Sequence, residues 1–278
     1  MLNILLLLSG FLYCFSLSWG SSLGFWLAME AAGLIIVAGF FNYGLTINRY
    51  KGLLYYLLVS GTSASLIFSG FLSPFLAGFV VIGFIMKAGL TPFSSWVLVV
   101  YNNCGWTLLF YIAVVSKVIL LYTCYLLPAG QGNQLLELLF LLSMLYLPYI
   151  LWSSGLGIKL FLAISSISSG AVLLVVEMNS GYLNGFILYL CYFITSLVSF
   201  LILFLAEKGQ LNSESGLILF FVSLTIPCSL LFLYKFISVL CLLGESWYLL
   251  LFWVSYSIVE QIYLYIFLLE KICKSFNW

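Results

Sequence analysis

Three lysines lie inside long apolar stretches of this 278-residue chain: Lys87, Lys117 and Lys235. A lysine near the middle of a bilayer costs roughly 2.5–3.5 kcal/mol on insertion scales. An ionisable residue at such a depth therefore indicates a functional site first of all. A lysine that loses its water shell gives up its proton more easily, so these three residues could exchange protons inside a membrane.

Two acids lie in comparable positions. Glu30 lies well inside an apolar stretch near the start, and Glu260 lies in the second half of the last one. A carboxylate close to Lys87 favours the charged ammonium, and its departure favours proton release. We expect Glu30 to act on Lys87 in this way, with a static buried ion pair as the alternative. Glu260 could serve Lys235 or contact a neighbouring subunit.

Accessory polar residues gather in one later stretch, ISSISSG. Its hydroxyls at Ser165, Ser166, Ser168 and Ser169 suit either helix–helix packing or a hydrated proton wire. Lys159 stands at the start of the same stretch. A long lysine side chain at a helix end can reach the membrane surface, which favours a structural purpose for this residue.

Composition indicates a membrane protein and excludes several kinds of chemistry. Hydrophobic residues make up 65% of the chain and charged residues 6%, whereas soluble domains carry about 25% charged residues. The absence of His and Asp excludes Ser-His-Asp catalysis, His-ligated haem or zinc, and Asp-based phosphoryl chemistry. The seven cysteines form no CxxC pair, so we expect neither a disulfide framework nor metal-cluster ligands. A net charge of +1 indicates no nucleic-acid partner.

Ten apolar stretches are long enough to be membrane helices, since about 20 apolar residues cross a bilayer. The predicted helices are 2–18, 22–41, 52–70, 71–101, 105–126, 134–152, 157–177, 183–206, 215–243 and 246–269. The fourth and ninth are too long for a straight crossing of a core about 30 Å thick. Each contains a lysine and a proline, Pro92 or Pro227, so we expect both to be broken near the proline.

The two broken helices stand at matching places in two sets of five, residues 1–127 and 128–278. Interrupted helices at corresponding places in two halves are typical of inverted-repeat transporters. Five is an odd number, so the two halves would have opposite orientations in the membrane. The predicted fold class is an all-α polytopic membrane protein of two inverted five-helix repeats, with ordinary proline-containing helices as the alternative.

Charges at loops and helix ends predict the orientation of the chain. With ten spans, both termini and every even-numbered loop face one side of the membrane. That side receives Arg49, Lys51, Lys159, Lys208, Lys271 and Lys274, while the opposite loops hold Glu177 and Glu245. The positive-inside rule then places both termini in the cytoplasm or the mitochondrial matrix.

Five segments in order along the chain carry a family resemblance. They are AMEAAGL around Glu30, KAGLTPFSSW from Lys87, WTLLFYIAVVSK up to Lys117, KLFLAISSISSGAVLL from Lys159 and IPCSLLFLYKFISV around Lys235. Together they resemble the antiporter-like proton-pumping subunits of respiratory complex I, in a divergent and shortened form. Relatives often have His near the places that Ser94 and Ser169 occupy here, and animal relatives usually have one further C-terminal span.

The resemblance implies a role for each buried charge. Glu30 would be the modulating acid, Lys87 the first proton site, Lys117 the connecting lysine and Lys235 the exit-side lysine. The chain would belong to the proton-translocating NADH:ubiquinone reductase of the mitochondrial inner membrane, with both termini in the matrix. Distant quinone reduction would drive the transfer, and this chain would perform no redox catalysis.

The resemblance also implies what surrounds the chain. FMN, iron–sulfur clusters and ubiquinone would belong to other subunits, and no cofactor or small-molecule substrate would bind here directly. The partners would be other antiporter-like and small membrane subunits, together with lipid such as cardiolipin.

Two other functions remain open on the sequence. A self-standing cation/proton antiporter more often carries a pair of intramembrane Asp residues, and this chain has no Asp. A non-transporting multi-span scaffold has no need of three lysines inside its spans. Co-purification with a large NADH-oxidising assembly would separate these possibilities.

Overall fold

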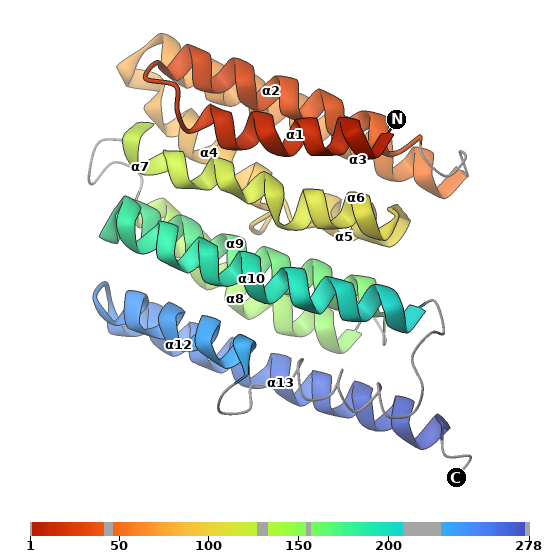
Figure 1. Ribbon diagram of the computed structural model, residues 1–278. Helices are drawn as coiled ribbons and strands as arrows, with labels where there is room; N and C mark the ends of the chain where they lie inside the picture. Colours follow the sequence, from red (N-terminus) through yellow and green to blue (C-terminus); the bar gives the residue numbers. More distant parts are fainter. Residues whose placement is uncertain (1, 42–46, 127–132, 154–156, 208–228, 276–278) are drawn as a thin grey trace.

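The computed structural model describes residues 2–41, 47–126, 133–153, 157–207 and 229–275, and all regular structure in these ranges is helical. The elements run side by side in a bundle (Figure 1). They are α1 (Leu2–Ser16), α2 (Ser22–Gly39), α3 (Ile47–Leu72), η1 (Pro74–Leu76), α4 (Ala77–Ala88), α5 (Ser95–Asn103), α6 (Trp106–Ala113), η2 (Val115–Tyr122), α7 (Thr123–Leu126), α8 (Asn133–Ser153), α9 (Ile158–Ser180), α10 (Tyr182–Glu207), α12 (Leu230–Leu243) and α13 (Trp247–Ser275). η1 and η2 are 3-10 helices.

Seven of the described helical segments are long and apolar enough to cross a membrane, and three shorter apolar helices accompany them. The predicted class, an all-α polytopic membrane protein, is confirmed. The count of ten spans stays a prediction, because most of the ninth predicted helix before α12, including Pro227, lies outside the described residues. The inverted repeat and the division at residue 127 likewise stay predictions.

The two ends of the bundle differ in charge. The start of α1 and the end of α13 lie at one end (Figure 1). The same end holds the start of α3, with Arg49 and Lys51, and the start of α9, with Lys159. The other end holds Glu137 at the start of α8 and Glu245 in the turn between α12 and α13. We call these the basic end and the acidic end.

The fourth predicted helix is broken beside its proline, as expected. α4 ends at Ala88 and α5 begins at Ser95, with Pro92 between them. Gly89 closes α4 with a positive φ of 74°, and its N–H donates to the carbonyls of Ile85 and Met86. Glycine accepts this left-handed conformation readily because it has no Cβ to clash. The break leaves Lys87 in the last turn of α4, at the edge of non-helical backbone.

The fifth predicted helix is not a uniform α-helix. α6 ends at Ala113, and the eight residues of η2 follow in 3-10 conformation before α7. Runs of 3-10 helix beyond three or four residues are uncommon, and such a stretch in mid-helix often marks a functional hinge. Lys117 lies within η2.

α9 is the central helix of the bundle. Most of its residues are buried, and it packs against α5, η2, α8 and α10. This helix carries the serines of ISSISSG, so its burial brings their hydroxyls inside the protein and away from lipid.

Candidate functional site

The first ion pair joins α4 to α2. Lys87 Nζ lies 3.2 Å from Glu30 Oε1, and the two side chains are 17% and 24% exposed. The structure thus brings Glu30 and Lys87 together as an ion pair, and the action of Glu30 on the Lys87 proton stays a prediction. Because both groups are largely removed from water, each is stabilised by the opposite charge of the other.

Lys117 is enclosed by neutral groups. Its ammonium donates to the carbonyl of Ser166 at 2.5 Å, to Ser169 Oγ at 2.6 Å and to the Tyr192 hydroxyl at 3.0 Å. It also lies 4.2 Å from the centre of the Tyr192 ring, a favourable cation–π distance. None of its contacts in the described part of the chain is a carboxylate. A cation held in this way can release its proton without leaving an unpaired carboxylate behind.

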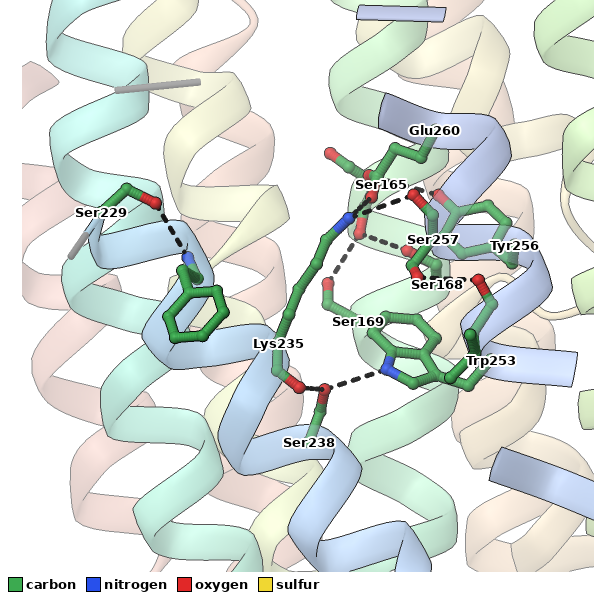
Figure 2. Close-up of polar contacts among 12 residues, drawn as sticks. Ser165, Ser168, Ser169, Ser229, Lys235, Ser238, Trp253, Tyr256, Ser257 and Glu260 are labelled. Atoms are coloured by element: carbon green, nitrogen blue, oxygen red, sulfur yellow. Dashed lines mark hydrogen bonds and ion pairs between the residues drawn. The ribbon is translucent and has the colours of Figure 1, made fainter. Parts of the chain in front are cut away.

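The third lysine pairs with the acid of the last helix (Figure 2). Lys235 Nζ on α12 lies 2.6 Å from Glu260 Oε2 on α13, and both side chains are nearly buried. The Tyr256 hydroxyl donates to the other Glu260 oxygen at 3.4 Å. Of the two roles considered for Glu260, contact with Lys235 is the one that the structure places within the chain.

Local hydrogen bonds fix α12 in the position that this pair requires (Figure 2). Ser229 caps the helix, since its Oγ accepts from the Phe232 N–H at 3.1 Å. Ser238 donates to the carbonyl of Lys235 at 2.7 Å and accepts from Trp253 Nε1 at 3.0 Å. The bond from Trp253 joins α13 to α12 one turn after the lysine, while the other two bonds lie within α12.

Two separate cavities lie beside the three lysines. The first has a volume of about 70 Å³, and its polar lining includes Glu30, Lys87, Tyr101, Ser116, Lys117 and Ser166. The second has a volume of about 110 Å³, and its polar lining includes Ser165, Ser169, Tyr192, Lys235 and Glu260. Lys117 lines the first cavity, while its partners Ser169 and Tyr192 line the second. A buried water needs about 10–15 Å³ and several polar partners, so each cavity has room for several waters.

The serines of α9 separate into distinct environments. Ser166 accepts a hydrogen bond from the Tyr101 hydroxyl at 2.7 Å, on the side of the first cavity. Ser169 contacts Lys117 and lines the second cavity, and Ser165 lines that cavity beside Lys235. Each of these serine hydroxyls also donates to a carbonyl of its own helix, so the contacts are compatible with packing and with proton transfer.

Lys159 lies apart from this row, at the basic end. Its ammonium donates to the carbonyl of Cys104 at 3.1 Å and lies 5.8 Å from the centre of the Trp106 ring. Lys159 thus ties the turn between α5 and α6 to the start of α9, a placement that fits the structural interpretation. Burial raises the pKa of the Cys104 thiol in this turn to about 12, although the charges of Lys159 and Arg49 oppose the rise.

The prediction that Glu177 lies in a loop at the exit of its helix is wrong. α9 continues to Ser180, and Glu177 is fully buried within its last turn. The apolar pattern ends before Glu177, but the helix continues for one more turn, which includes the polar residues Asn179 and Ser180.

Sequence reasoning missed the tyrosines of the site. Tyr101, Tyr192 and Tyr256 each donate or accept a hydrogen bond at the lysines, their serine partners or the acid. The chain has 19 tyrosines, and aromatic residues of membrane proteins commonly lie in belts at the membrane surface. Only the packing of α5, α10 and α13 against the lysines distinguishes these three. Among the described residues, no three His, Cys, Asp or Glu side chains gather where they could hold a metal ion.

No protein-family model matches the sequence, and no curated protein matches it. Solved structures do match. A chain of the membrane-bound sulfane sulfur reductase, an archaeal respiratory membrane complex, superposes with a TM-score of 0.80 at 17% identity, over 96% of this chain and 65% of that one. A chain of respiratory complex I from Thermus thermophilus, with bound aureothin, superposes with a TM-score of 0.73 at 20% identity, over 90% of this chain and 65% of that one.

This chain has the fold of a subunit of these respiratory membrane complexes. It spans about two thirds of the length of each matched chain, 65% in both cases. The resemblance indicated by the five sequence motifs is confirmed at the level of fold. A subunit number and a mitochondrial origin stay predictions.

Proposed function

We propose that this chain is a proton-translocating membrane-arm subunit of a respiratory complex, corresponding to subunit 2 of mitochondrial NADH:ubiquinone oxidoreductase. The observation that carries the proposal is the row formed by the Lys87–Glu30 pair, Lys117 and the Lys235–Glu260 pair, with two cavities beside these groups inside an apolar bundle. The order of the five motifs and the fold of the matched respiratory subunits support it.

The different surroundings of the three lysines suggest how a proton moves. Glu30 and Glu260 each place a carboxylate beside Lys87 and Lys235, whereas Lys117 contacts only neutral groups among the described residues. When the charge of Glu30 is neutralised or moves away, Lys87 is no longer stabilised as a cation and releases its proton into the first cavity. Water in that cavity carries the proton to Lys117.

The central lysine then passes a proton onward. Ser169 and Tyr192 contact Lys117 and also line the second cavity, so their hydroxyls connect the ammonium to the water beside Lys235. A proton that arrives from the side of Lys87 adds a positive charge beside Lys117, and the repulsion drives the proton on Lys117 toward Lys235. Lys235 passes its own proton to the Glu260 carboxylate and can then accept the proton from Lys117.

The energy for this transfer comes from outside the chain. In our proposal FMN, the iron–sulfur clusters and ubiquinone are held by other subunits, and quinone reduction in the assembly changes the charge near Glu30. Other antiporter-like and small membrane subunits adjoin this chain, with lipid such as cardiolipin filling the remaining surface. The basic end faces the mitochondrial matrix, in agreement with the positive-inside rule.

A substitution of Lys117 tests the proposal. Lys117→Met keeps much of the side-chain volume and removes the titratable group, so the complex should assemble and oxidise NADH. The number of protons pumped per NADH oxidised should fall markedly in vesicles. Lys159→Met is the matched control, because Lys159 lies outside the row and should leave the ratio unchanged.

Lys117→Arg makes the test independent of assembly defects in the Met variant. Arg keeps the charge but effectively cannot release its proton, so the pumping ratio should fall here too. A normal ratio in either assembled variant would contradict the role of Lys117. A chain that purifies alone and never with an NADH-oxidising assembly would indicate the self-standing antiporter instead.

A further inference from the structure

A second buried acid lies outside the row of lysines. Glu177 is 0% exposed and lies in the last turn of α9, near the acidic end. Here α9 packs against α7 and against the first turns of α10. The proposed proton path does not use this residue.

The space around the Glu177 carboxyl depends on one glycine. A Cβ placed on Gly185 of α10 would lie 1.6 Å from Glu177 Oε1, far inside any permitted contact. The carboxyl therefore packs directly on the backbone of α10. Gly185 makes the room for it.

Within the described ranges, no cation or strong donor compensates the carboxyl. Neither of its oxygens has a nitrogen or oxygen hydrogen-bond partner among the residues that the structure describes. The ion pairs within those ranges are Lys87–Glu30 and Lys235–Glu260. The ammonium of Lys117 is already bonded to Ser166, Ser169 and Tyr192.

The titratable groups that face Glu177 are themselves neutral. The Cys124 thiol of α7 interacts with the carboxyl, and its own hydrogen is directed to the Leu121 carbonyl at 3.6 Å. Tyr182 of α10 interacts with both groups, and its ring packs on Tyr125 at 5.3 Å between centroids. Two other acids at this end, Glu137 and Glu245, interact with one another.

An ionised carboxylate in such surroundings costs far more to bury than the neutral acid, so the group takes up a proton instead. We infer that Glu177 is a proton-binding site which carries the neutral carboxylic acid at rest, and which exchanges that proton with the aqueous phase at the acidic end. This inference does not rest on the proposed function.

The surroundings determine which side the proton comes from. Residues 172–176 of α9 are apolar and buried, and they separate Glu177 from Ser169. Eight residues of α-helix correspond to about 12 Å without a polar group on this face. In the other direction Asn179 and Ser180 are partly exposed. Water at the acidic end is therefore the source and the destination of the Glu177 proton.

A neutral buried acid has a characteristic reactivity toward hydrophobic carbodiimides. The carboxyl oxygen bonds to the central carbon of the carbodiimide, and the acid proton moves to one of its nitrogens, giving an O-acylisourea. Transfer of the acyl group from oxygen to nitrogen then yields a stable N-acylurea with no group lost. An ion-paired carboxylate lacks the proton that this addition needs.

The test treats the intact complex with dicyclohexylcarbodiimide and locates the adduct by mass spectrometry. We expect the adduct on Glu177, with less of it as the pH rises, and little on Glu30 or Glu260, which serve as internal ion-paired controls. Glu177→Gln should remove the adduct from this peptide. Preferential labelling of Glu30 or Glu260 would overturn the inference.

A second measurement decides the case if the reagent does not reach the pocket. The infrared difference spectrum between the native complex and Glu177→Gln should show the loss of a protonated-carboxyl C=O band. Loss of a carboxylate band instead would show that Glu177 is ionised, and the inference would then be wrong.

Discussion

At the scale of single residues, the three buried lysines differ in what surrounds them. Lys87 and Lys235 each face a carboxylate, and Lys117 faces two hydroxyls and a carbonyl. Removing one partner of a buried ion pair costs about 3–5 kcal/mol, whereas replacing both by neutral groups is often without cost. This difference allows the stabilising role of a pair to be separated from a role in proton transfer.

The first prediction applies this separation to Glu30 and Lys87. Glu30→Gln alone should lower the thermal stability of the complex, because it leaves the Lys87 ammonium buried without a counter-ion. The double variant Glu30→Gln/Lys87→Met should regain most of that stability. Proton pumping per NADH should stay low in both. A double variant that regains the normal pumping ratio would indicate a static ion pair.

The second prediction concerns the close contact between Gly185 and Glu177. Alanine normally stabilises a helix interior relative to glycine, by about 0.5–1 kcal/mol. Gly185→Ala should instead lower the melting temperature of the complex, because the new methyl group would overlap the carboxyl. Adding Glu177→Ala should recover most of the loss.

Gly61→Ala on α3 is the matched control for this experiment. A Cβ at Gly61 meets nothing within 4 Å, so the substitution should leave the melting temperature unchanged or slightly higher. Equal melting temperatures for Gly185→Ala and Gly61→Ala would contradict the close contact.

At the scale of elements, the change from α6 to η2 is the feature with the clearest functional meaning. A helix that changes its winding leaves carbonyls without their usual partners. Two tyrosines of α10 donate to carbonyls at this change of winding. Tyr192 donates to the Ala113 carbonyl at 3.1 Å, and Tyr189 donates at 3.4 Å to the Val114 carbonyl, which also accepts from the Lys117 N–H at 3.2 Å. α10 thereby stabilises the 3-10 conformation that places Lys117 between the two cavities.

The third prediction follows from these two bonds. Tyr189→Phe removes only the bond to the Val114 carbonyl, so any effect on Lys117 must pass through the backbone of η2. We expect faster amide hydrogen exchange over residues 113–122 and fewer protons pumped per NADH, in the same direction as for Tyr192→Phe. Tyr146→Phe, a change of an exposed tyrosine on α8, should alter neither. If Tyr189→Phe shows the same hydrogen exchange and pumping ratio as the native complex, the prediction is wrong, and Tyr192 acts on Lys117 directly and not through the backbone of η2.

At the scale of the whole molecule, charge distinguishes the two ends of the bundle while the lysine row crosses its middle. Arg49, Lys51 and Lys159 lie at the end that also holds the start of α1 and the end of α13 (Figure 1). In our proposal the row runs across the helices, so a proton would move sideways through the chain as well as between its two ends. The chain would thereby pass charge to a neighbouring subunit in the membrane.

The fourth prediction concerns orientation. Lys51→Cys at the basic end should react with a membrane-impermeant maleimide only from the matrix side, and Leu183→Cys at the acidic end only from the opposite side. Native Cys104 should stay unlabelled at neutral pH, because it is buried and its thiol, with a pKa of about 12, remains protonated. Labelling of both introduced cysteines from one side would contradict the predicted topology.

The sequence by itself determined the membrane class, most helix positions, the break beside Pro92 and the identity of the buried lysines. Each of these depends on local properties: the length of an apolar run, the backbone chemistry of proline and glycine, and the cost of a charge in lipid. The contact of Glu30 with Lys87 was also predictable, because few acids were available inside the spans.

Only the tertiary structure decided how the site is completed. Tyr192 reaches Lys117 across 75 residues of sequence, and Glu260 reaches Lys235 across 25. The 3-10 winding of η2 depends on carbonyl partners from α10, and the burial of Glu177 depends on the bare backbone of Gly185. None of these features can be recognised from the sequence around the residue, because each arises from the way one helix packs against another.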